Sequence, residues 1–106
     1  MAWVCLLIAG VLEVVWAYSM KLSAGFTRFL PSTVTVVTMM ASFVLLAISM
    51  RTLPLGTAYT IWTGIGAVGA FAAGILFLGE PVNGLRILAA ALIASGIVLM
   101  KLSSTY

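Results

Sequence analysis

One acidic residue stands in the middle of an uncharged stretch, AGVLEVVWAYSM at positions 9–20, where Trp16 follows Glu13 by three residues. No other charged side chain occurs in residues 1–20. In a membrane-crossing helix that begins near residue 2, Glu13 lies roughly 16 Å along the axis, at about 1.5 Å per residue, and so near the midplane. An acid at that depth costs about 2.5–3.5 kcal/mol on insertion scales and usually marks an ion or substrate pathway. Glu13 is therefore the predicted substrate- and proton-binding residue.

The chemistry open to such an acid is exchange of a proton for a cation. A medium of low dielectric favours the neutral, protonated carboxyl group over the carboxylate. A purely structural acid would need a basic partner at the same depth, but every Lys and Arg lies at or near the end of an apolar run. These residues are Lys21, Arg28, Arg51, Arg86 and Lys101. The sequence thus indicates proton-coupled exchange at Glu13.

Aromatic and small residues share the predicted helix faces with this acid. Helical spacing puts Gly10 one turn before Glu13 and Trp16 one turn after it, and it puts Tyr59 and Trp62 on one face of a later helix. Aromatic rings attract a cation by about 0.5–2 kcal/mol, and a planar guanidinium can take both carboxylate oxygens. We expect a cation pocket, and the residues predicted to line it are Gly10, Trp16, Met39, Ser42, Tyr59, Thr60, Trp62 and Thr63.

Two features of the third apolar run have a second interpretation. Gly64 and Gly66 fit a hinge that bends during transport, but small residues also allow close helix packing in membranes. Tyr59 lies near the start of the run, where aromatic residues often anchor a helix at the interface. Both interpretations stay open for these residues.

Four apolar runs supply the elements that must position the site. They span 2–20, 32–50, 57–78 and 85–102, and each is close to the roughly 20 residues that a membrane-crossing helix needs. The chain is 64% hydrophobic and 7% charged, whereas soluble domains are about a quarter charged. Short connections containing Gly and Pro make consecutive helices antiparallel neighbours. The prediction is an all-α integral membrane protein, with residues 1–106 forming a single domain of four transmembrane helices.

Composition also excludes several classes of protein. The chain has no His and one Cys, which argues against zinc sites, disulfides and Cys/His catalysis. An enzyme is the least favoured class, because one chain offers neither a paired acid nor a nucleophile beside a base. The scattered basic residues do not form a nucleic-acid-binding face. We therefore expect no cofactor and no metal, and the expected partners are membrane lipid, a small organic cation and protons.

The two membrane faces of the chain carry nearly equal numbers of Lys and Arg residues, so charge predicts no strong preference for one orientation. The face with both termini and the 51–56 connection carries Arg51 and Lys101, and the other face carries Lys21, Arg28 and Arg86. Such a small bias predicts insertion in both orientations, although a modest preference for one remains the alternative. Many transporters obtain their two states from inverted repeats. Two copies inserted in opposite senses, forming an antiparallel homodimer, would supply that inversion.

The sequence resembles the small multidrug resistance transporters along essentially its whole length. The likeness rests on LEVVWA around Glu13, GFTRFLPS in the first connection, ASF containing Ser42, and LPLGTAYTIWTGIGAVGA opening the third run. Trp16 directly after EVV is similar to the guanidinium-exporter branch of the family. The resemblance implies a dual-topology, antiparallel homodimer in the bacterial inner membrane that exports guanidinium-type cations in exchange for protons. It also implies that the proton and the substrate share Glu13 as their binding site. The residues that line this site would be Gly10, Trp16, Ser42, Tyr59 and Trp62. The Gly64–Gly66 region would be the flexible part of the third helix, and the last helix would supply dimer contacts.

Two alternatives accompany this interpretation. Thr60 departs from the alanine that is common in the branch, and together with Met20 and Met39 it favours a broader exporter of quaternary ammonium or substituted guanidinium compounds. The alternative from another class is a non-transporting accessory or assembly subunit of the membrane. Such a subunit would have no need of Glu13, so the Glu13→Gln variant would keep its function.

Overall fold

The computed structural model describes residues 1–104, so the last two residues of the predicted domain lie outside the described part. Its four helices are α1 (Ala2–Leu22), α2 (Phe29–Ser49), α3 (Leu55–Leu78) and α4 (Gly84–Leu102). Each is long and apolar enough to cross a membrane. Residues 1–104 contain no strand. The predicted class, an all-α membrane protein with four transmembrane helices, is confirmed.

The helix ends follow local sequence signals. Pro31 lies in the first turn of α2, where a missing N–H costs nothing, and Pro54 directly precedes α3. The α3 helix ends at Gly79, whose φ of 66° is the left-handed conformation that favours glycine. Asn83 caps α4 by accepting a hydrogen bond from the Arg86 backbone N–H at 3.0 Å. As a result, α2 begins three residues before the predicted run, and α3 begins two residues before it.

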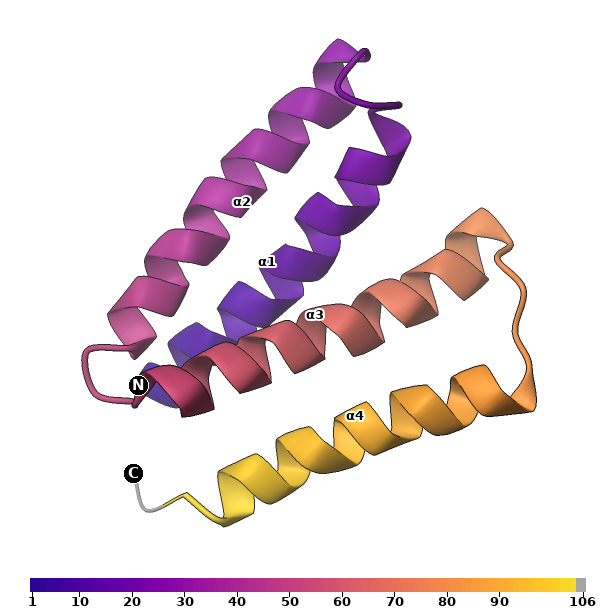
Figure 1. The fold of residues 1–106 in the computed structure, drawn as a ribbon. Helices are drawn as coiled ribbons and strands as arrows, with labels where there is room; N and C mark the ends of the chain where they lie inside the picture. Colours follow the sequence, from indigo (N-terminus) through magenta and orange to yellow (C-terminus); the bar gives the residue numbers. More distant parts are fainter. Residues whose placement is uncertain (105–106) are drawn as a thin grey trace.

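The helices lie in one flat layer in the order α2, α1, α3, α4 (Figure 1). The α1 helix packs on both α2 and α3, α4 packs on α3 alone, and α2 makes only slight contact with α3. The expectation that all consecutive helices are close neighbours was therefore wrong for α2 and α3. The reason is the close approach of α1 to α3, where Gly66 and Gly69 of α3 lie directly against α1 side chains. The layer measures 43 × 34 × 16 Å.

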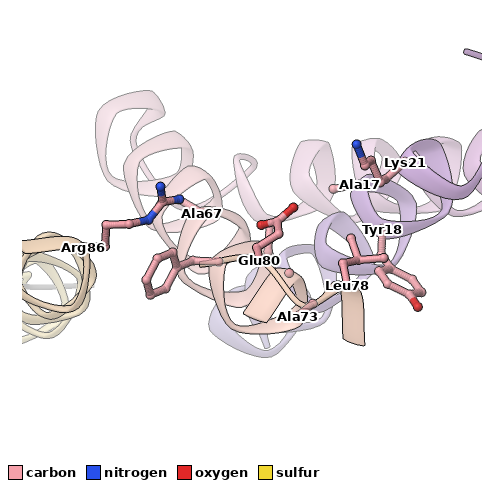
Figure 2. Close-up of a pocket in the computed structure, with 11 residues that line it drawn as sticks. Ala17, Tyr18, Lys21, Ala67, Ala73, Leu78, Glu80 and Arg86 are labelled. Carbon is pink, nitrogen blue, oxygen red and sulfur yellow. The ribbon is translucent and has the colours of Figure 1, made fainter. Parts of the chain in front are cut away.

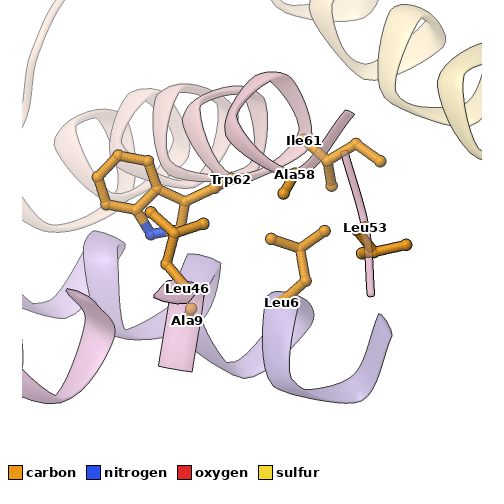
Figure 3. Close-up of a cluster of buried hydrophobic side chains, with 7 residues drawn as sticks. All are labelled: Leu6, Ala9, Leu46, Leu53, Ala58, Ile61 and Trp62. Carbon is orange, nitrogen blue, oxygen red and sulfur yellow. The ribbon is translucent and has the colours of Figure 1, made fainter. Parts of the chain in front are cut away.

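The hydrophobic core is a cluster of seven buried side chains (Figure 3), which lies toward the end of the layer that holds the start of α1 and the α2–α3 connection (Figure 1). It draws on α1, α2, α3 and the connection before α3, while α4 has no buried residue. At this end the Lys101 ammonium also lies 4.3 Å from the ring centre of Trp3, which joins α4 to α1. The core residues are Leu6, Ala9, Leu46, Leu53, Ala58, Ile61 and Trp62.

Candidate functional site

The Glu13 side chain lies directly against Gly66 of α3. A Cβ atom at position 66 would collide with the carboxyl group of Glu13, so the absence of a side chain at Gly66 is what allows this approach. The Oε1 atom of Glu13 is buried and has no hydrogen-bond partner among residues 1–104. Buried polar atoms in proteins are nearly always hydrogen-bonded. This oxygen is therefore a buried acceptor that no donor of the described chain satisfies.

A buried hydroxyl group joins the three helices one turn before Glu13. Ser42 of α2 donates a hydrogen bond to the Ala9 carbonyl of α1 at 2.7 Å. The indole N–H of Trp62 on α3 donates to the Ser42 hydroxyl at 3.0 Å. Ser42 and Trp62 are both buried, so these bonds are shielded from competing solvent. They hold the Trp62 indole against α1 and α2, and Trp62 itself lies one turn before Gly66 on α3.

Four aromatic rings form a continuous row from α1 to α3. Trp16 meets the edge of Phe43 with ring centres 6.3 Å apart, and Phe43 lies 5.9 Å from Trp62. Tyr59 continues the row at 5.7 Å from Trp62. The indole nitrogen of Trp16 is buried and, like the oxygen of Glu13, has no partner within the described chain. Phe43 and Tyr59 are half exposed, at 45% and 53%, so one side of the aromatic row stays open.

Phe43 was missed by the sequence interpretation. The residue directly follows Ser42 and points about 100° away from it around the helix, so helical spacing alone puts it on another face. Its ring nevertheless meets Trp16 on α1 and Trp62 on α3. The only sequence signal was its place in the ASF motif, next to the predicted hydroxyl group.

The remaining predicted residues occupy different surroundings. Gly10 packs against Ile65, and Gly64 packs against Ile97 of α4, so both permit close helix contacts. Met39 is half-buried, one turn before Ser42 on α2. Thr60 and Thr63 are exposed, and the groove that they line lies on the α4 side of α3 instead of facing Glu13. That groove has a volume of about 320 Å³ and is completed by Tyr59, Gly64, Ala67 and Ile93. The pocket and hinge roles of all these residues stay predictions.

The arrangement around Glu13 is suited to a small organic cation. It combines a buried carboxyl oxygen that has no partner among residues 1–104 with a row of aromatic rings that begins at Trp16, one turn after Glu13. A carboxylate accepts charge-assisted hydrogen bonds, which are roughly twice as strong as neutral ones. Residues 1–104 contain no cluster of His, Cys, Asp or Glu able to hold a metal ion. An N–H-bearing cation fits this set of groups.

Comparison with known proteins adds an independent finding. The family model described as "Small Multidrug Resistance protein" matches residues 1–93. Curated proteins named "Guanidinium exporter" from Citrobacter freundii and Salmonella typhimurium are each 55% identical over 104 residues, covering 98% of this chain and 99% of the relative. A protein of the same name from Escherichia coli K12 is 54% identical over the same length. The likeness therefore extends over all four helices.

Proposed function

The chain belongs to the small multidrug resistance family, and from that premise we propose that it exports guanidinium-type cations in exchange for protons at Glu13. Family membership makes it a multi-pass transporter of the bacterial inner membrane, not an enzyme. The observation that carries the proposal is the buried Oε1 atom of Glu13, which has no partner in the described chain and lies within a membrane-spanning helix.

The substrate class follows from the groups around this oxygen. A guanidinium ion is planar and presents paired N–H donors, which match the two oxygens of a carboxylate. The rings of Trp16 and Trp62 add faces on which a flat, weakly hydrated cation can rest. The relatives at 54–55% identity are named for guanidinium export. Guanidinium is therefore the first substrate to test.

Coupling arises because the proton and the cation compete for one carboxyl group. The protonated acid gives up its proton to one side of the membrane, and the resulting carboxylate binds the cation. When the loaded site opens to the other side, a proton displaces the cation. The protonated site then reopens to the first side and can release its proton there. In each loaded state a proton or a cation offsets the negative charge at the site, which lowers the cost of carrying Glu13 through the low-dielectric interior. The empty, unprotonated site is costly and should switch slowly.

Alternating access requires two arrangements of the same site, and an antiparallel homodimer would provide them. Three features support this assembly. The single layer is only 16 Å thick, α4 has no buried residue, and Phe43 and Tyr59 leave the aromatic row open on one side. The small charge difference between the two faces also favours insertion in both orientations. A second, inverted copy would bring two Glu13 carboxyl groups to one central site.

A broader exporter of quaternary ammonium or substituted guanidinium ions is the second candidate. The observation in its favour is the groove of about 320 Å³ between α3 and α4, because Tyr59 belongs both to that groove and to the aromatic row. A hydrophobic substituent on the cation could extend along Tyr59 into this groove. Exposed Thr60 would then border the substituent instead of the charged group.

The test is transport in proteoliposomes with an imposed proton gradient, comparing guanidinium with tetramethylammonium. Wild type should move guanidinium, and Glu13→Gln should not. Thr33→Val, at an exposed site on α2 whose hydroxyl bonds only to Phe29 of its own helix, is the matched control and should behave like wild type. Equal transport of both cations would favour the broader exporter. Absence of coupled transport in folded, inserted wild type would favour the accessory subunit.

A further inference from the structure

A second pocket lies between α1 and α3, nearer the membrane face that carries the 23–28 and 79–83 connections. Its volume is about 330 Å³. Three charged side chains reach it: Lys21 from α1, Glu80 from the connection after α3, and Arg86 from α4. Figure 2 shows the Glu80 carboxyl group between Arg86 on one side and Lys21 on the other. The pocket thus has a charged mouth at the membrane surface.

The deep end of this pocket lies one turn from the Glu13 site. Its walls include Ala17, one turn after Glu13 on α1, and Ala70, one turn after Gly66 on α3. Small side chains at these positions leave the space open. The pocket therefore extends from the surroundings of Glu13 toward the surface along the seam between α1 and α3.

The two acidic residues of the chain contact the same helix at the two ends of this seam. Glu13 lies against Gly66, and the carboxyl group of Glu80 lies against Gly74. The two glycines are about two helical turns apart, or roughly 12 Å along α3. A Cβ atom at either glycine would collide with the acid beside it. The seam thus has a carboxyl group at each end.

Local structure holds the groups at the mouth in place. The α3 helix ends in left-handed Gly79, and the backbone N–H of Glu80 then donates to the Gly74 carbonyl at 3.1 Å. The Arg86 guanidinium lies 5.7 Å from the ring centre of Phe71 on the pocket wall. Within residues 1–104, Glu80 forms no ion pair with Lys21 or Arg86. Its carboxylate therefore remains able to bind an arriving cation.

We propose that Glu80 is a second, transient carboxylate contact for the guanidinium cation, at the mouth of the pocket that leads to Glu13. This inference rests on the proposed function and deepens it. With Glu80 present the mouth carries two positive charges and one negative charge, and without it two positive charges face an arriving cation. Fields in a low-dielectric cleft change the local concentration of a charged substrate and its rate of association. Glu80 keeps the pathway passable to cations that Lys21 and Arg86 would otherwise repel.

The experiment measures initial guanidinium transport at subsaturating concentration, at about 10 mM and about 1 M ionic strength, where the Debye length changes from about 30 to 3 Å. The variants are Glu80→Gln, Glu80→Asp, Arg86→Gln, and Glu80→Gln combined with Arg86→Gln. At low ionic strength Glu80→Gln should slow transport roughly tenfold, at the lower end of electrostatic effects in charged clefts. Glu80→Asp should keep most of the rate, Arg86→Gln should match or exceed wild type, and the double variant should recover. High salt should shrink all of these differences.

Two further readouts separate the possible failures. Guanidinium affinity at equilibrium is followed by tryptophan fluorescence, and in Glu80→Gln it should stay near the wild-type value because Glu13 is intact. A loss of affinity that parallels the loss of transport would mean that the central site is damaged, and it would overturn the inference. Transport by Glu80→Gln at the wild-type rate in low salt would also overturn it, while leaving the proposed function standing. If wild type moves no guanidinium at all, the proposed function fails, and the inference fails with it.

Discussion

The carboxyl group of Glu13 on α1 occupies the space that a side chain at Gly66 of α3 would need. The small residue is therefore required by the acid on the neighbouring helix. This contact fixes where the carboxyl group lies, while its Oε1 atom keeps no partner among the described residues.

Replacing this glycine should displace the acid. In Gly66→Ala the new methyl group meets the Glu13 carboxyl group, and guanidinium affinity should fall at least about tenfold, as expected for loss of a charged hydrogen-bonding contact. Gly56→Ala is the matched control, because a Cβ atom there meets nothing within 4 Å. Binding is followed by tryptophan fluorescence. Equal affinities in the two variants would mean that the contact does not position the acid.

The buried hydroxyl group of Ser42 should contribute to stability. Ser42→Ala removes the bonds to the Ala9 carbonyl and the Trp62 indole, and leaving a buried donor unpaired costs about 1–3 kcal/mol. The free energy of unfolding in detergent mixtures should fall by that amount, with a shift in tryptophan emission. Ser103→Ala removes a hydroxyl that bonds to Met100 of the preceding turn at an exposed position, and it should have almost no effect. A Ser42→Ala protein as stable as Ser103→Ala would refute the three-helix link.

Phe43 should matter for binding although it carries no polar group. Phe43→Leu breaks the aromatic row between Trp16 and Trp62, and it should weaken guanidinium binding by about 0.5–2 kcal/mol, the range of a cation–π contact. Phe29→Leu makes the same chemical change at the start of α2, where the ring is 80% exposed, and should leave affinity unchanged. Equal titrations for the two variants would remove Phe43 from the site.

The first connection holds strain that a glycine should relieve. Ala24 has a φ of 51°, beside Gly25 at 75° and Phe26 at 66°. The left-handed conformation costs a residue with a Cβ atom about 1–2 kcal/mol. Ala24→Gly should therefore raise the free energy of unfolding by about 1 kcal/mol after its greater freedom in the unfolded chain is subtracted. Gly25→Ala should lower it, and a change of opposite sign in either variant would contradict the loop conformation.

Sequence reasoning predicted the four helices because runs of about 20 apolar residues leave a membrane-embedded backbone few other structures. It also singled out Glu13, since an isolated acid in such a run is costly. The order of the helices could not be predicted in this way. It depends on the contacts of Gly66 and Gly69 with α1, and single-helix periodicity does not reveal which helix a glycine faces. For the same reason Phe43 escaped notice, and the α3–α4 groove that Thr60 and Thr63 line could not be foreseen. Their predicted role in the cation pocket stays a prediction.

The central claim is that the proton and the cation share Glu13, and proton release on binding tests it most directly. Guanidinium is added to the purified protein in weakly buffered detergent solution, and released protons are measured with a pH indicator at several starting pH values. Wild type should release protons as guanidinium binds, most strongly where Glu13 is still protonated before the addition, and its apparent affinity should rise with pH. Glu13→Gln should release none. Guanidinium binding to wild type without proton release, and with the same affinity from about pH 5 to pH 9, would contradict the account.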